Sequence, residues 1–196
     1  MSVYDISDCQ PDDRVGDLVA RGADGIILKI GETLGGVPTL DEKFITFVND
    51  VVTAGLPYGI YYVSHAHDMD DFIAEAQWIN DQVYALLGGK EPELGTWWDL
   101  ETGPVCRDDV WPQVRDAIGT MQAWWGDSHK IGIYAQYSYI YKYLDLDELA
   151  AYQIPIWEAQ YYRENSLKIE HPELKHVCWQ FTTNGEQQDE DEWYGF

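Results

Sequence analysis

The chain alternates short apolar runs, rich in β-branched and aromatic residues, with segments that carry apolar residues at helical spacing. This alternation limits the possible folds most strongly, because strands separated by helices pair in parallel and leave the helices outside the sheet. We predict strands at residues 3–7, 25–30, 58–63, 95–101, 130–136, 154–162 and 176–182. We predict helices at residues 12–21, 41–54, 68–87 and 108–125, one or two short helices within 137–151, and none between the last two strands.

Five strand–helix units followed by strands alone predict an α/β fold with a parallel, barrel-like sheet inside a layer of helices. A length of 196 residues fits one domain, residues 1–196, that is large enough to hold a rigid concave site. The apolar stripe of the clearest helix, 68–87, consists of Phe72, Ala76, Ile79, Val83 and Leu86.

Acidic residues far outnumber basic ones: 35 Asp and Glu face 12 Lys and Arg, for a formal net charge of −23. A nucleic acid partner would need a basic face, so we exclude that class of partner. On composition alone we interpret the excess charge, including the acidic tail QQDEDEWYGF, as solvated surface. No apolar run is long enough to span a membrane, and the first residues lack the basic and apolar regions of a secretory signal.

The three cysteines, Cys9, Cys106 and Cys178, are odd in number and form no CxxC pair, so we expect free thiols, with one disulfide as the alternative. His65 and His67 follow a predicted strand, but a zinc site needs further ligands at defined spacing. We therefore expect neither a metal ion nor a cofactor.

Parallel barrels keep their chemistry at the carboxyl ends of their strands, so polar residues at those ends are the candidate site. The strand-end polar residues are Asp5, Lys29, Tyr61, Asp99, Glu101, Tyr134, Gln160 and Gln180.

The segment WWDLE carries the densest chemical signal. Residues two apart on a strand share a face, so Asp99 and Glu101 should project together, with their Cα atoms about 6–7 Å apart. Trp97 should share that face, whereas Trp98 and Leu100 should point into packing. Two acids in an aromatic cleft raise each other's pKa, so one can stay protonated while the other is ionised, as glycosidic cleavage requires. A lone D-x-E often arises by chance in an acidic chain and then lies on a solvated face of a strand. This one ends an apolar, tryptophan-rich strand, and that context favours a functional site.

Further motifs occur in a fixed order along nearly the whole chain. They are YDISDCQ (Tyr4–Gln10), KIGE (Lys29–Glu32), DEKF (Asp41–Phe44), AGLPYGIYY (Ala54–Tyr62), WWDLE, GIYAQ, WEAQY (Trp157–Tyr161), WQF (Trp179–Phe181) and DEDEW (Asp189–Trp193). Together with the D-x-E strand, this series resembles the family 25 glycoside hydrolases, the muramidases found as phage endolysins and secreted lysozymes.

The resemblance implies a flattened TIM-like (β/α)5(β)3 barrel of eight mostly parallel strands with about five flanking helices. It also implies cleavage, with retention, of the β-1,4 bond between N-acetylmuramic acid and N-acetylglucosamine in bacterial peptidoglycan. Glu101 would be the general acid and then base, and Asp99 either the nucleophile or the group that orients the substrate's acetamido group. Asp5 and Asp189 would complete an acidic floor. The residues expected to hold sugars are Tyr61, Trp97, Tyr134, Gln160, Tyr161 and Lys29.

The chain departs from the family pattern at three places. It has Tyr61-Tyr62-Val63 where the family has Y-H-F, Gly31-Glu32-Thr33 after the second strand, and Asp191 in place of the usual Asn. The alternatives are a glycan-binding domain without turnover and a barrel glycosidase for another N-acetylated glycan such as chitin, although the D-x-x-D-x-D-x-E run of chitinases is missing. We expect a monomer without a wall-binding module that acts on the bacterial wall, either as a phage or prophage endolysin released at lysis or as a catalytic fragment of a larger protein.

Overall fold

The computed structural model describes residues 1–126, 130–183 and 189–196. The strands within these ranges are β1 (Ser2–Ile6), β2 (Gly25–Leu34), β3 (Val37–Leu40), β4 (Tyr58–Val63), β5 (Thr96–Asp99), β6 (Ile131–Gln136), β7 (Ile156–Ala159), β8 (His176–Thr183) and β9 (Asp189–Trp193). The helices are α1 (Arg14–Ala20), α2 (Phe44–Ala54), α3 (Met69–Leu87), the 3-10 helix η1 (Gly103–Val105), α4 (Val110–Trp124), α5 (Tyr137–Tyr143), α6 (Leu146–Tyr152) and α7 (Ser166–Glu170).

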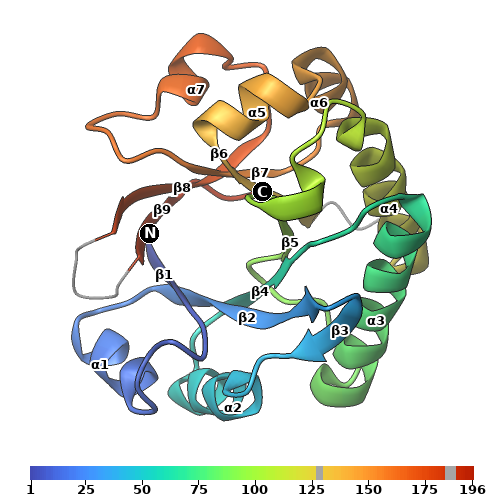
Figure 1. Ribbon diagram of the computed structural model, residues 1–196. Helices are drawn as coiled ribbons and strands as arrows, with labels where there is room; N and C mark the ends of the chain where they lie inside the picture. Colours follow the sequence, from blue (N-terminus) through green and yellow to red (C-terminus); the bar gives the residue numbers. More distant parts are fainter. Residues whose placement is uncertain (127–129, 184–188) are drawn as a thin grey trace.

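Eight of the strands close into a barrel, and β3 lies outside it (Figure 1). The order around the barrel is β1-β9-β8-β7-β6-β5-β4-β2, and β1 pairs with β2 to close it. Neighbouring strands run parallel from β1 through β2 and β4 to β8, and β9 runs antiparallel to both of its neighbours. The TIM-like barrel of mostly parallel strands that the family resemblance implied is therefore confirmed.

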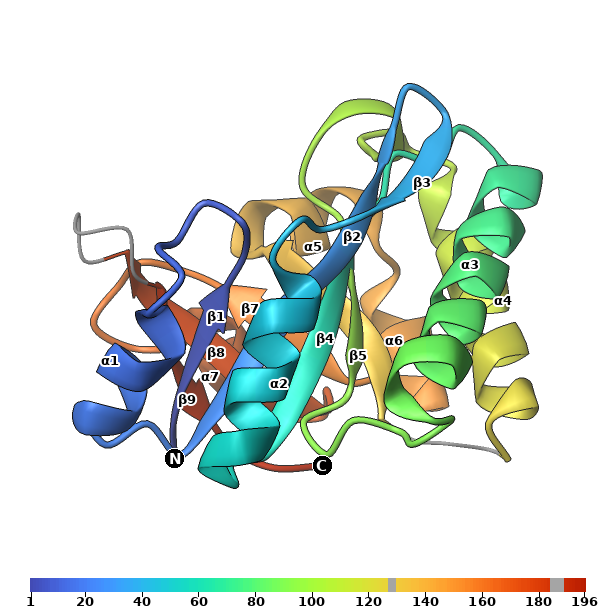
Figure 2. The ribbon, with the colours of Figure 1, turned by 90° about the horizontal axis from the view of Figure 1, so that it is seen from below.

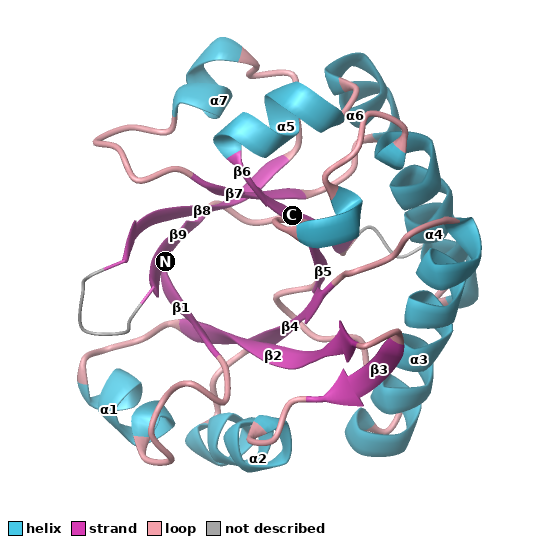
Figure 3. Cartoon of the chain, viewed as in Figure 1, coloured by secondary structure: helices cyan, strands magenta, loops and turns pink. Residues whose placement is uncertain are grey.

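Helices cover much of the outside of the barrel, and their apolar faces form the larger of two cores (Figure 3). In α3, Phe72, Ala76, Ile79 and Val83 are buried as predicted, whereas Leu86 is 38% exposed and lies outside the buried stripe. Asp68 caps this helix by accepting a hydrogen bond from the Asp71 backbone N–H at 3.1 Å. None of the helices in the described ranges combines the length and the apolarity needed to cross a lipid bilayer.

The second core fills the barrel itself and is rich in aromatic rings. It contains Val3, Ile27, Leu94, Trp97, Tyr134, Trp157, Ala159, Val177, Cys178 and Trp193. Trp97 belongs to this inner core and Trp98 to the outer one, so the alternation predicted for the WWDLE strand is confirmed. The three cysteines are free thiols, as expected.

Three elements differ from the sequence prediction. The strand that begins at Gly25 continues to Leu34 and turns back into β3, through Gly35 and Gly36 with φ angles of 59° and 81°. This left-handed Gly-Gly pair suits a tight hairpin turn. A short helix, α7, also connects the strands β7 and β8, for which no helix was predicted.

The acidic tail is the third difference. Composition alone predicted a solvated terminus, but Asp189–Trp193 forms β9 and closes the barrel between β1 and β8. Alternate residues of β9 face inward, and Asp191 and Trp193 are buried. Residues 187 and 188 of the predicted tail lie outside the described residues.

The two ends of the barrel differ in what they carry. Both chain termini lie at one end, whereas the β2–β3 hairpin and the segment after β5 rise from the other (Figure 2). That second end is where the parallel strands finish, so it is the end at which such barrels place a site.

Candidate active site

A cavity of about 110 Å³ opens at the carboxyl-terminal end of the barrel. The residues that line it are Asp5, Tyr61, Asp99, Glu101, Tyr134, Trp157, Gln180 and Asp189. They come from or directly follow β1, β4, β5, β6, β7, β8 and β9. The barrel therefore brings the four predicted catalytic acids and two of the predicted aromatic residues to one place.

The path of the chain after β5 turns Asp99 and Glu101 toward the same cavity. β5 ends at Asp99, yet the sheet hydrogen bonding continues, because the Leu100 N–H donates to the Tyr134 carbonyl at 2.9 Å. Leu100 is fully buried in the outer core. Its neighbours on either side therefore point inward, in keeping with the alternation of a strand.

Asp5 and Asp189 face each other across the antiparallel pair β1 and β9. Side chains of residues that oppose each other in such a pair lie on the same face of the sheet, and here that face is the inside of the barrel. Asp191, two residues further on, is 1% exposed and accepts a hydrogen bond from Trp157 Nε1 at 2.7 Å. The acidic floor therefore has a buried layer below Asp5 and Asp189.

Gln180 connects the acids to the tyrosines. Its Nε2 donates to Asp5 Oδ2 at 2.9 Å, and its Oε1 accepts from the hydroxyls of Tyr134 at 2.8 Å and Tyr161 at 3.0 Å. Because all three partners are on different strands or loops, the buried Gln180 amide fixes their relative positions.

Burial and neighbouring negative charge raise the pKa of both acids of the D-x-E pair. For Asp99, burial acts most strongly, and Glu101 and Asp5 add to it, so the pKa lies well above its usual range. Burial raises the pKa of Glu101 most strongly and the charge of Asp189 adds to it, against the lowering effect of the polar groups of Tyr134 and Gln136. A protonated acid beside an acid that can ionise is the combination that general acid catalysis at a glycosidic bond needs.

The pKa values of the acids in the floor of the cavity are raised as well. Burial and the charge of Asp189 raise the pKa of Asp5 to about 7, while hydrogen bonding from Gln180 lowers it. Burial likewise raises the pKa of Asp189 and, with the added charge of Asp5, that of Asp191. Burial and mutual repulsion therefore both oppose full ionisation of this group of acids.

Aromatic rings form the apolar part of the cavity. The Trp157 ring lies 4.4 Å from the ring of Tyr134 and 6.1 Å from that of Tyr61, measured between centroids. Flat rings of this kind suit the apolar face of a sugar ring, and their polar atoms can orient its hydroxyls.

Four of the predicted sugar-binding residues do not line this cavity. Trp97 is fully buried, with its Nε1 donating to the Leu94 carbonyl at 2.8 Å, so it supports the ring of Trp157 from inside the barrel and presents no face to a sugar. The amide of Gln160 is buried and accepts a hydrogen bond from the Ser166 N–H at 2.8 Å, so it orders the loop after β7.

Lys29 and Tyr161 lie at the border of the site. Lys29 forms an ion pair with Glu32 at 3.1 Å and lines a smaller neighbouring cavity, although its charge still lowers the pKa of Asp99. Tyr161 is half-exposed and reaches the cavity through its hydrogen bond to Gln180.

Three residues of the site, Trp157, Gln180 and Asp191, had no catalytic or sugar-binding role assigned to them from the sequence. Gln180 was one of the strand-end polar residues, and Trp157 begins the WEAQY motif. Asp191 could have been found by applying strand alternation to DEDEW, which places it on the face of Asp189. In the described part of the chain, no group of three or more His, Cys, Asp or Glu side chains is placed to hold a metal ion.

Comparisons with known proteins agree with this geometry. The family model described as "Glycosyl hydrolases family 25" matches residues 4–190. A search of curated protein sequences returned no match.

Solved structures with the same fold include an autolysin, an endolysin catalytic domain and a muramidase. The modular autolysin LytC from Streptococcus pneumoniae superposes with a TM-score of 0.79 at 20% identity, over 98% of this chain and 46% of that one. The catalytic domain of endolysin ply40 from bacteriophage P40 of Listeria monocytogenes gives 0.74 at 21% identity, over 97% and 91%. A muramidase from Acremonium alcalophilum gives 0.76 at 17% identity, over 100% and 94%. This chain thus spans about half the length of the LytC chain.

The barrel, its acid-lined cavity and the family match over nearly all of the sequence lead to one conclusion: the chain belongs to family 25 of the glycosyl hydrolases.

Proposed function

We propose that the protein is a muramidase that hydrolyses the β-1,4 bond between N-acetylmuramic acid and N-acetylglucosamine in peptidoglycan. The observation that carries the proposal is the pair Asp99 and Glu101, whose carboxyl groups line one aromatic-walled cavity and both have raised pKa values. The substrate class follows from the family and from its neighbours: LytC has been solved with a synthetic peptidoglycan ligand, and the Acremonium enzyme is a muramidase.

In the first step, Glu101 gives its proton to the glycosidic oxygen as the bond from that oxygen to C1 breaks. Burial raises the pKa of Glu101, which favours the protonated form that this step needs. Positive charge develops at C1, and the surrounding carboxylates stabilise it in a site that largely excludes water.

Asp99 takes one of two roles as the charge develops. Its carboxylate either bonds to C1 directly, or it accepts the N–H of the substrate's acetamido group so that the acetamido oxygen bonds to C1. Both roles need Asp99 ionised, and the charge of Lys29 favours that state against burial and the neighbouring acids. A water molecule then attacks C1, breaks the bond from C1 to the Asp99 carboxylate or to the acetamido oxygen, and gives a proton to Glu101. This restores the acid and leaves the configuration at C1 retained.

Asp5, Gln180 and the tyrosines position these groups. The hydrogen bonds from Gln180 to Asp5 and from Tyr134 to Gln180 hold the floor in one arrangement. The rings of Tyr61, Tyr134 and Trp157 would support the sugar whose bond is cut.

Mass analysis of digested peptidoglycan tests the assignment of the bond. After digestion and borohydride reduction, a muramidase leaves the reduced form of N-acetylmuramic acid at every new end. Reduced N-acetylglucosamine at the new ends would instead identify the other glycosidic bond of the strand. Release of fragments from chitin oligomers at a comparable rate would overturn the substrate class.

A further inference from the structure

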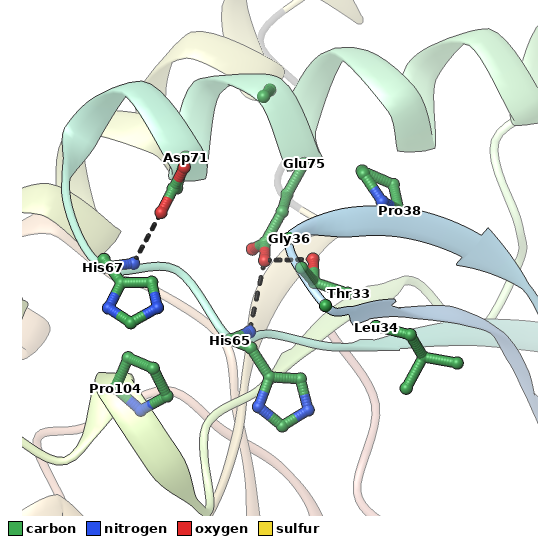
Figure 4. Close-up of a pocket in the computed structure, with 11 residues that line it drawn as sticks. Thr33, Leu34, Gly36, Pro38, His65, His67, Asp71, Glu75 and Pro104 are labelled. Carbon is green, nitrogen blue, oxygen red and sulfur yellow. Dashed lines mark hydrogen bonds between the residues drawn. The ribbon is translucent and has the colours of Figure 1, made fainter.

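A second and larger cavity, of about 450 Å³, lies at the same end of the barrel as the catalytic cavity. The turn between β2 and β3, the segment after β4, the first turns of α3 and the segment after β5 form its walls (Figure 4). The segment after β5 also carries Glu101, three residues before Pro104 in the wall. The two cavities are therefore connected through one stretch of chain.

A buried carboxyl group holds this cavity open. Glu75 of α3 is 2% exposed, and its two oxygens accept hydrogen bonds from the Thr33 and Ser64 hydroxyls at 2.7 and 2.6 Å and from the His65 N–H at 3.2 Å. Thr33 belongs to the hairpin wall, whereas Ser64 and His65 both belong to the segment after β4. The hydrogen bonds of Glu75 therefore fix the hairpin and the segment after β4 in place before any ligand arrives.

The lining combines an apolar wall with acidic and imidazole groups. Leu34, Pro38 and Pro104 supply the apolar surface, and Leu34 is 52% exposed at the tip of the hairpin. Asp71 lies at the opposite wall and accepts the His67 N–H through Oδ2 at 2.9 Å. The described residues that line the cavity include neither lysine nor arginine. The charge of the lining therefore favours a ligand with a positive group.

We propose that this cavity binds the peptide that peptidoglycan carries on its muramic acid, with the side-chain ammonium of the peptide's diamino acid near Asp71. The inference rests on the proposed muramidase function and extends it from the sugar chain to the attached peptide. The small side chains of such a peptide fit the apolar wall of Leu34, Pro38 and Pro104. The rings of His65 and His67 can pair with its carbonyl or carboxylate groups.

Position supports this occupant. A peptide attached to a sugar in the catalytic cavity leaves it over the rim, and the wall of the larger cavity begins three residues after Glu101. At about 110 Å³ the catalytic cavity is about a quarter of the size of the larger cavity and offers a peptide less room.

Two substitutions test the cavity without touching the catalytic groups. Ala74→Phe fills the cavity from an exposed position of α3. Asp71→Asn removes the charge but keeps an oxygen for the His67 N–H. Ala54→Phe is the matched control, because Ala54 is also exposed but is the last residue of α2 and lies away from the cavity lining.

The measurement compares two substrates for each protein: glycan strands that carry peptides, and the same strands after an amidase has removed the peptides. For Ala74→Phe and Asp71→Asn we expect KM to rise at least about fivefold on peptide-bearing strands, a loss on the order of 1 kcal/mol, and to stay unchanged on bare strands. The Ala54→Phe control should match the wild type on both. Equal KM changes on the two substrates, or none, would overturn the peptide site, whereas failure of the wild type to cut either substrate would overturn the muramidase function itself.

Binding of a free peptide gives a second readout. We expect a pentapeptide with lysine at its third position to shift the imidazole NMR signals of His65 and His67 and to leave those of His171 and His176 in place. Acetylation of the lysine side chain should weaken this binding. Equal binding of the acetylated peptide, or shifts at His171 and His176 as large as those at His65 and His67, would contradict the proposal.

Discussion

Gln180 donates a hydrogen bond to Asp5 at 2.9 Å, across the barrel interior from β8 to β1. The same amide accepts from Tyr134, which borders Glu101 and Asp99. One neutral side chain therefore connects the floor acids to the proposed catalytic pair.

Replacing Gln180 with alanine should slow turnover and change its pH dependence. Without the Gln180 N–H, the pKa of Asp5 rises further above 7, since that hydrogen bond lowers it. We expect kcat to fall about 10- to 100-fold, in line with the loss of one preorganised donor, with the acid limb of the pH–rate profile moved to higher pH. Kinetics from pH 4 to 9 check this, and a profile with an unmoved acid limb would show that Gln180 does not act through Asp5.

Trp97→Phe should affect stability and leave substrate binding alone. Trp97 is fully buried between Trp157, Trp193 and Phe196, so the smaller ring loses packing inside the barrel. We expect a cost of about 2 kcal/mol. The corresponding fall in Tm is about 2–4 °C per kcal/mol for a domain of this size. KM should stay within twofold of the wild type. A raised KM at unchanged Tm would show instead that Trp97 contributes to sugar binding.

Glu158 should make the protein less stable as the pH rises. This carboxyl is completely buried, and burial raises its pKa from 4.5 to about 8. Between those two values the folded chain holds a proton that the unfolded chain has released, so the free energy of unfolding falls as the pH rises through this range. The stabilising contribution is complete below pH 4.5 and lost above pH 8.

Glu158→Gln isolates that contribution, because the amide keeps the shape and cannot ionise. We expect Tm to equal that of the wild type at pH 5 and to exceed it by at least about 2–4 °C at pH 8. Thermal unfolding at the two pH values provides the test. The same gain at both pH values would mean that packing, rather than ionisation, sets the difference.

Wall lysis should rise with moderate salt. The chain carries a net charge of −23, and many bacterial walls are themselves anionic, so the two repel each other at low ionic strength. Added salt shortens the Debye length from about 30 Å at 0.01 M to about 8 Å at 0.15 M and removes most of that repulsion. Turbidity assays over this range provide the test, and short soluble peptidoglycan fragments, which lack the anionic polymers of the wall, are the control substrate. A steady fall in lysis from the lowest salt upward would contradict this expectation.

The main elements could be predicted from sequence because each has a local signal. The stripe from Phe72 to Val83 and the inward alternation of Trp97 against Trp98 depend only on the period of a helix or a strand. The pairing of Asp99 with Glu101 in one cavity follows from that same alternation.

The remaining parts of the site depend on the register of the strands and on closure of the barrel, and no short stretch of sequence encodes either of them. Trp97 and Trp157 both point into the barrel, yet only Trp157 reaches the cavity, because the stagger of the strands sets the layer in which each ring lies. Asp191 is buried because β9 pairs with strands from both ends of the chain. Composition could not predict this for so acidic a segment.

The rate at which Glu101→Gln produces new reducing ends from peptide-free glycan strands tests the central claim most directly. With no proton to give, the amide should lower turnover by at least about 10²–10⁴-fold while Tm and circular dichroism stay those of the wild type. Turnover within tenfold of the wild type by a correctly folded Glu101→Gln protein would contradict the role of the Asp99 and Glu101 pair.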